Sequence, residues 1–233
     1  MKPTSNLLFG ILLLAFMGSG QIVAQDCNAY FPYKEGYTIE MMHYDKKDKL
    51  SGSSVQKVKS IRQIDRGMAY VMSQLFRDDK GVEQFSGDFE ISCKDGLIRV
   101  DMRKLLGPAM MGAYEGMEVQ IDGDQLEFPS SLQVGQVLKG GVMNITIMNQ
   151  GMKVMSMQVV VSDRVVEAKE NLTTPAGTFE CYKIAYDTET KLLMKVKSKS
   201  EEWIAEGVGV VKMASYGSNG KLENYSVLTS FSR

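Results

Sequence analysis

The chain has 233 residues with 27 basic and 28 acidic side chains, which gives a formal net charge of −1. A nucleic-acid-binding surface normally shows an excess of Lys and Arg, so this balance argues against a nucleic-acid partner. The length fits one domain, or a tight pair, that buries a core without metal ions or several disulfides.

The first 25 residues have the features of a secretory signal peptide. Lys2 supplies positive charge, and the apolar run 7–17 is followed by small residues at 18–20. That run is shorter than the ~20 apolar residues that span a bilayer, and no later segment reaches that length. We therefore expect residues 1–25 to be removed on export. Residues 26–233 are expected to form a single β-rich domain without a transmembrane segment, in the periplasm, the outer envelope or outside the cell.

Three cysteines, Cys27, Cys93 and Cys181, would meet an oxidising compartment after export. One disulfide and one free thiol is the simplest arrangement, and the sequence does not say which two pair. The alternative is that all three are buried free thiols. Cys27 also lies close enough to the signal for lipid attachment, but Gln25 and Asp26 replace the small residues that this modification requires.

From residue 37 onward, short runs rich in branched and aromatic residues alternate with turn signals such as Asp95-Gly96, Asn149-Gln150-Gly151 and Asn219-Gly220. The runs that we expect to be strands are 37–44, 55–65, 68–76, 84–93, 97–102, 118–121, 125–128, 142–148, 152–161, 164–170, 178–187, 194–203, 208–216 and 222–231. The pattern predicts a mainly β protein, with a curved antiparallel sheet or partly open β-barrel of about a dozen strands.

Residues 103–116 interrupt this pattern. The segment is apolar, poor in branched residues, and contains Pro108, which suits the first turn of a helix. A short helix or a mobile flap is expected here, and the flap would carry Met110, Met111 and Tyr114.

Methionine is unusually frequent, with 17 residues, and nine of them lie between Met102 and Met157. One interpretation is that flexible thioethers fill irregular gaps in a core. Another is that they line a soft apolar cavity. In the run 152–161, period-2 alternation places Met155 and Met157 on one strand face, while the opposite face is also largely apolar. The cavity hypothesis gives six candidate lining residues: Met110, Met111, Tyr114, Met155, Met157 and Trp203.

Familiar catalytic and metal-binding patterns are missing from the sequence. His43 is the only histidine, and no GxSxG, HExxH or phosphate-binding loop occurs. A copper(I) site made of Met152, Met155 and Met157 is disfavoured, because a strand sends Met152 to the opposite face. We predict no enzyme activity, catalytic residue, metal or cofactor, although a hydrolase with paired carboxylates remains an alternative.

The C-terminal third carries two recognisable motifs. Pro175-Ala176-Gly177-Thr178-Phe179 is followed by Trp203 and by Gly207-Val208-Gly209-Val210-Val211-Lys212. These motifs resemble those of the TapB-type exported proteins of Bacteroidetes and related domains of unknown function. The resemblance implies a half-barrel similar to that of the lipoprotein-localisation carriers, which hold acyl chains in an apolar concavity. It transfers no catalytic residues.

The sequence therefore predicts an exported, non-enzymatic binding protein that holds a lipid or other apolar small molecule in a half-barrel cavity. The first alternative is an accessory module whose apolar face docks an envelope protein. A hydrolase is the less favoured alternative.

Overall fold

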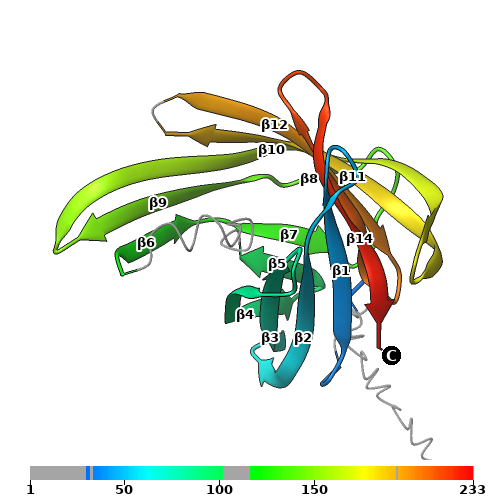
Figure 1. Cartoon of the computed structure of the whole chain (residues 1–233). Helices are drawn as coiled ribbons and strands as arrows, with labels where there is room; N and C mark the ends of the chain where they lie inside the picture. The colour runs from blue at the N-terminus through cyan, green and yellow to red at the C-terminus, as the bar shows by residue number, and fades with distance from the viewer. Residues whose placement is uncertain (1–29, 32–33, 102–115, 193, 233) are drawn as a thin grey trace, which may run out of the picture.

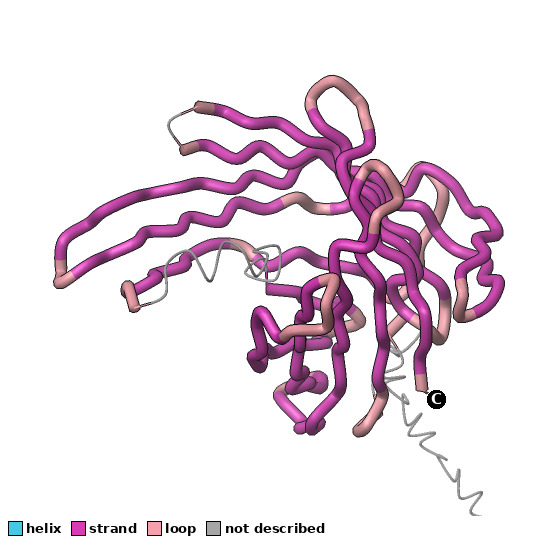
Figure 2. Tube along the Cα trace, in the orientation of Figure 1, coloured by secondary structure: helices cyan, strands magenta, loops and turns pink. Residues whose placement is uncertain are grey.

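The computed structural model describes residues 30–31, 34–101, 116–192 and 194–232, and these form one antiparallel β-sheet (Figures 1 and 2). Its strands are β1 (Thr38–Asp45), β2 (Leu50–Ile64), β3 (Gly67–Asp78), β4 (Glu83–Lys94), β5 (Leu97–Asp101), β6 (Glu118–Gly123), β7 (Gln125–Pro129), β8 (Val137–Leu138), β9 (Gly141–Asn149), β10 (Met152–Thr174), β11 (Gly177–Lys191), β12 (Lys195–Ala205), β13 (Gly209–Gly217) and β14 (Leu222–Phe231).

The predicted β class and most predicted strands are confirmed, with two differences in the middle of the chain. The two-residue strand β8 was not predicted, and two predicted runs form one strand. The runs 152–161 and 164–170 form a single strand, β10, of 23 residues. Asp163 adopts a positive φ of 53° there, and the register of β10 against β11 shifts between Ser162 and Val165. A β-bulge thus absorbs the break that the sequence suggested.

No helix occurs in the described part of the chain. The segment 103–116, where a short helix or flap was predicted, lies outside the described residues except for Gly116. The predicted signal peptide, residues 1–25, also lies outside them.

Two predicted tight turns have the backbone that their sequences require. Asp95 and Gly96 have φ values of 54° and 75°, and Gln150 and Gly151 have φ values of 51° and 77°. Two consecutive positive φ angles are typical of the type I′ turn, which matches the twist of the strands that it joins. These turns connect β4 to β5 and β9 to β10.

The order of strands in the sheet shows that it curls back on itself. The order is β6-β9-β10-β11-β12-β13-β14-β1-β2-β3-β4-β5-β7, with β8 pairing separately with β10. The edge strands β6 and β7 stand at opposite ends of this order, yet only Asp124 separates them in the chain. The two edges must therefore lie close together, which bends the sheet into a nearly closed barrel (Figure 1).

Arg164 links β10 to the edge strand β7 across a seam inside the barrel. Its guanidinium Nη1 donates hydrogen bonds to the carbonyl oxygens of Glu127 on β7 (3.1 Å) and of Lys139 (2.6 Å). The guanidinium also lies 4.6 Å from the centre of the Phe128 ring. Arg164 is only 1% exposed, so a buried cation supplies hydrogen bonds to backbone carbonyls at this seam.

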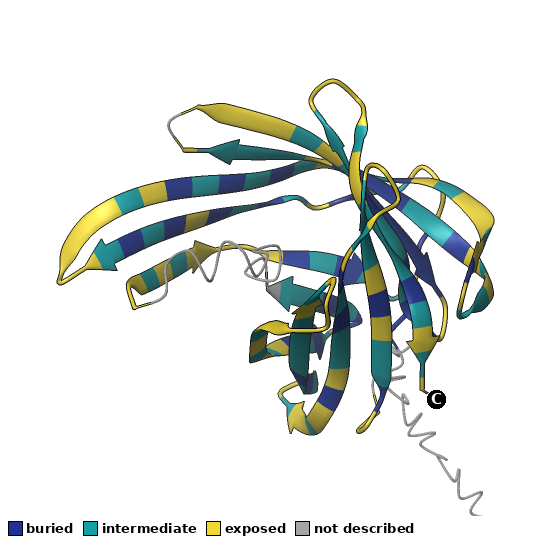
Figure 3. Ribbon diagram, in the orientation of Figure 1, coloured by how far each residue is buried: buried dark blue, intermediate teal, exposed yellow. Residues whose placement is uncertain are grey.

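The main core lines the inside of the barrel. Along β9 the buried side chains Met143, Ile145 and Ile147 alternate with more exposed ones, as the banding of the strands shows (Figure 3). This alternation is the period of two expected for a strand with one face toward a core.

A second apolar cluster lies on the other face of the sheet. It contains Cys181, Trp203, Val211 and Leu228, and the partly buried Phe179 packs against it from the β10–β11 hairpin. That hairpin bends at the right of Figure 1. By covering apolar side chains on the outer face, it explains why β11 and β12 bury residues on both faces.

The described cysteines differ in state. Cys93 is disulfide-bonded, while Cys181 is a buried free thiol, and burial raises its pKa to about 11. Cys27, the third cysteine of the chain, lies outside the described residues.

Candidate functional site

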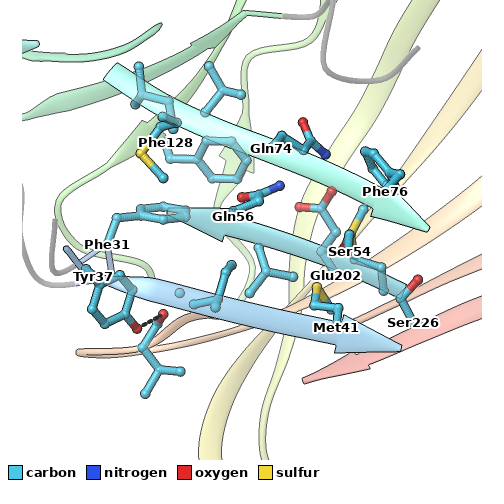
Figure 4. A pocket seen from close by; sticks show the side chains of 18 of the residues that line it. Phe31, Tyr37, Met41, Ser54, Gln56, Gln74, Phe76, Phe128, Glu202 and Ser226 are labelled. Atoms are coloured by element: carbon cyan, nitrogen blue, oxygen red, sulfur yellow. Dashed lines mark hydrogen bonds between the residues drawn. The ribbon is translucent and has the colours of Figure 1, made fainter. Parts of the chain in front are cut away.

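A cavity of about 300 Å³ lies inside the barrel, at the lower end of the range typical of small-molecule sites. Its walls come from strands β1–β5, β7 and β12–β14, together with Phe31 and Tyr37 from the segment that precedes β1 (Figure 4). Because these strands are far apart in the sequence, the cavity exists only once the sheet has curled.

One end of the cavity is aromatic. Phe31 and Phe128 meet edge to face with ring centres 5.9 Å apart, and Tyr37 lies beside them (Figure 4). The Tyr37 hydroxyl donates a hydrogen bond to the carbonyl oxygen of Val208 (2.8 Å). With that hydroxyl engaged, the ring presents an apolar surface to the cavity.

Polar side chains from β2 and β3 line the middle of the cavity. Gln56 and Gln74 are direct cross-strand partners, and Ser54 lies two residues before Gln56 on the same strand face. In the part of the chain that the structure describes, neither glutamine side-chain amide makes a hydrogen bond. Both side chains are half-buried, so their amides are free to hydrogen-bond to a bound molecule.

His43 and Ser226 form a second polar group. They are cross-strand partners on β1 and β14, and His43 Nδ1 lies 2.6 Å from Ser226 Oγ. The imidazole stacks on Phe76 with ring centres 5.8 Å apart, and burial lowers its pKa. His43 Nε2 is buried and has no hydrogen-bond partner among the described residues.

Glu202 on β12 is the acidic group of the cavity. Its Oε1 accepts a hydrogen bond from the Tyr186 hydroxyl (2.8 Å), and burial raises the pKa values of both groups. The hydrogen bond from Tyr186 and the positive charge of Arg164 oppose the effect of burial on Glu202. Among the described residues that line the cavity, Glu202 is the only one with a formal charge.

His43, Ser226 and Glu202 do not form the triad of a serine hydrolase. In such a triad the imidazole contacts the nucleophile through one nitrogen and a carboxylate through the other. Here His43 Nδ1 faces Ser226, and no described carboxylate contacts Nε2. No group of three or more His, Cys, Asp or Glu side chains able to hold a metal ion occurs among the described residues.

The three described candidates from the sequence, Met155, Met157 and Trp203, do not line this cavity. Met157 is buried in the main core on β10, where it pairs with Ile145, and Met155 is partly buried beside that core. Neither lines the cavity. Trp203 follows Glu202 directly, so it faces the outer cluster, where its indole nitrogen donates to Glu170 (2.5 Å). Met110, Met111 and Tyr114 lie outside the described residues.

Sequence reasoning missed the polar residues of the cavity, although a signal for them existed. On β2, Ser54 and Gln56 lie on the same strand face as the fully buried Val58, and on β3 Gln74 lies on the same face as Met72. Polar residues at inward positions of a strand are uncommon and indicate a site. Nothing in the sequence placed Glu202 beside them.

The fold and the cavity together define a protein with a nearly closed antiparallel β-barrel and an amphipathic interior pocket. The chain belongs to the DUF3108-like family, whose sequence profile matches residues 34–228. No curated protein matches it.

Two solved structures are similar over most of the chain. One is described provisionally as an exported protein with a YmcC-like fold, from Bacteroides fragilis. It is 26% identical, with a TM-score of 0.73, and covers 89% of this chain and 100% of its own. The other, described provisionally as a lipoprotein from Parabacteroides distasonis, is 22% identical with a TM-score of 0.74 and the same coverage. At this level of identity, the similarity shows only that the two proteins share a fold.

In the described part of this chain, no helix has the length and apolar character needed to cross a membrane.

Proposed function

We propose that this protein is exported and acts as a non-enzymatic binding protein that holds a lipid or other amphiphile in the barrel cavity. The observation that carries the proposal is the cavity of about 300 Å³, which has an aromatic end and a few inward polar groups. Ligand pockets have this composition, because apolar walls supply affinity and sparse polar groups orient the ligand.

Three further observations support export. The first 25 residues resemble a signal peptide, and the similar chain from Bacteroides fragilis is described as an exported protein. Cys93 is in a disulfide, which persists in oxidising compartments. The narrower likeness to TapB-type proteins stays a prediction from the sequence motifs.

Native mass spectrometry of the full chain, purified gently from the periplasm of an expression host, tests the proposal. Extra mass that matches a bound lipid or other amphiphile is the expected result. Met41→Trp should reduce the bound fraction because Met41 lines the cavity, whereas Met42→Trp should not, because Met42 points to the other strand face.

A bare chain that also fails to take up added amphiphiles would contradict the proposal. Equal loss of bound lipid in both tryptophan variants would show that the lipid sits elsewhere. Circular dichroism of both variants confirms that each is folded before the masses are compared.

A second candidate function is docking of an envelope protein, and exposed apolar side chains at two hairpin ends favour it. Met152 at the β9–β10 end is 70% exposed, and Met194 and Val196 at the β11–β12 end are 78% and 61% exposed. Lys195 and Lys197 alternate with them. An apolar patch among lysines fits a partner protein that has an apolar surface with acidic residues around it.

A photo-crosslinking residue at position 194 tests this candidate, with position 137 as the control, since Val137 is equally exposed on a different part of the sheet. A discrete crosslinked envelope protein from position 194 alone, lost in Lys195→Glu/Lys197→Glu, is expected. Crosslinks only to lipid or to a second copy of this chain would contradict it.

A further inference from the structure

We propose that the polar part of the cavity selects an amphiphile whose head group donates hydrogen bonds and carries no negative charge: a hydroxyl, amide or amine head. The inference rests on the proposed function and names the chemical class of its ligand. Fatty acids and phosphate-headed lipids are then poor ligands, although their chains would fit the apolar end equally well.

The hydrogen-bonding capacity of the cavity wall is the first argument. Gln56 and Gln74 each offer an amide oxygen and an amide NH₂ group without a described partner, and Ser54 and Ser226 add hydroxyls. All of these groups are uncharged. They match a head group that both donates and accepts hydrogen bonds, which a hydroxyl or amide does.

The charge of the wall is the second argument. Glu202 is the only formally charged residue among the described lining residues, so an anionic head finds no cation to pair with. Arg164, whose charge acts on Glu202, does not line the cavity, and its guanidinium is engaged with two backbone carbonyls and the Phe128 ring. The hydrogen bond that Tyr186 donates to Glu202 and the positive charge of Arg164 both favour the carboxylate form of Glu202. Beside that carboxylate an anionic head would be repelled, whereas an amine would be attracted.

The position of these groups is the third argument. Glu202, Met213, Ser226 and His43 are successive cross-strand partners on β12, β13, β14 and β1. They form one row across the cavity wall, and Phe31, Tyr37 and Phe128 gather at the opposite end (Figure 4). A ligand with its chain at the aromatic end therefore has its head near Gln56, Gln74 and Glu202.

Three amphiphiles with the same ten-carbon chain test the inference: monodecanoylglycerol, decylamine and decanoate. Each competes at pH 7.5 with the uncharged fluorescent probe N-phenyl-1-naphthylamine for the full chain purified from the periplasm and stripped of lipid. Monodecanoylglycerol and decylamine should displace the probe at concentrations at least about tenfold lower than decanoate.

Two substitutions locate the selectivity. Glu202→Gln keeps an acceptor for Tyr186 but removes the charge. The ratio of the displacing concentrations of decanoate and monodecanoylglycerol should therefore shrink by about tenfold, and decylamine should lose its advantage over decanoate. Glu201→Gln is the matched control, because Glu201 faces outward and pairs with Lys183 (2.8 Å). It should leave the ranking unchanged. Gln56→Leu/Gln74→Leu should weaken monodecanoylglycerol most.

The outcomes separate the two proposals. If none of the three amphiphiles displaces the probe or binds by calorimetry, the binding function itself is wrong. If decanoate binds as tightly as monodecanoylglycerol, or if Glu201→Gln changes the ranking as much as Glu202→Gln, the function stands and the head-group selectivity is wrong.

Discussion

His43 shows how one residue makes the stability of the barrel depend on pH. Its ring is packed against Phe76 and paired with Ser226, and burial lowers its pKa below the usual 6.5. The folded protein therefore binds fewer protons at this site than the unfolded chain does. The stabilising contribution is complete above about pH 6.5 and is lost as the pH falls through the lowered pKa of the folded state.

We predict that the free energy of unfolding falls more between pH 7.5 and pH 5 in the natural protein than in His43→Gln. Glutamine keeps a hydrogen-bonding group for Ser226 but does not titrate. Urea unfolding at a series of pH values measures the difference. Parallel pH curves for the two proteins would contradict the prediction.

Cys181 illustrates a different consequence of burial. Its thiol lies in the outer apolar cluster, and burial raises its pKa to about 11, so the reactive thiolate is scarce at neutral pH. We predict that Cys181 does not react with iodoacetamide at pH 8 in the folded protein and reacts readily in 6 M guanidinium. Peptide mass spectrometry of both samples gives the answer, and rapid labelling of the folded chain would argue against this packing.

At the scale of elements, Arg164 is the side chain that links β10 to the edge strand β7. Replacing it with methionine keeps much of the apolar stem but leaves the carbonyl oxygens of Glu127 and Lys139 without their donor. An unpaired buried carbonyl costs about 1–3 kcal/mol. We predict that Arg164→Met lowers the free energy of unfolding by about 3 kcal/mol or more.

Arg62→Met is the matched control for this change. Arg62 forms an exposed ion pair with Glu90, and exposed pairs contribute about 0–1 kcal/mol. Chemical unfolding of both variants compares the two sites. Similar small losses would show that Arg164 does not hold the seam together.

The strand β10 also shows what local sequence patterns miss. Period-2 alternation correctly placed Met157, Val159 and Val161 on a buried face. The predicted break before Arg164 was wrong as a strand end, because pairing with β11 and the short β8 carries the backbone through the bulge. A bulge needs partner strands on either side, so it depends on distant residues.

At the scale of the whole molecule, the closed part of the barrel and its projecting hairpins differ in burial. The end of the β9–β10 hairpin, from Asn149 to Val154, is exposed and extends beyond the barrel in Figure 3. In contrast, Val58 on β2 and Met72 on β3 are almost fully buried. Segments with few buried contacts open locally at low cost.

We therefore predict that backbone amides from Asn149 to Val154 exchange with deuterium at least about 100 times faster than those around Val58 and Met72. Hydrogen exchange followed by mass spectrometry measures both regions in one sample. Uniform protection would mean that the hairpin end is covered in solution, which would favour the docking function.

The sequence by itself determined the β class, the positions of most strands and two tight turns, because these depend on alternation and on residues such as Asp95-Gly96 that tolerate positive φ. The position of the cavity and the residues that line it followed only from the tertiary structure. The cavity residues Gln56, Gln74, Glu202 and Ser226 are far apart in the sequence, and the strand order β12-β13-β14-β1-β2-β3 brings them together. The tertiary structure also decided that Arg164 is buried, because Glu127 and Lys139, which accept its hydrogen bonds, come from other parts of the chain.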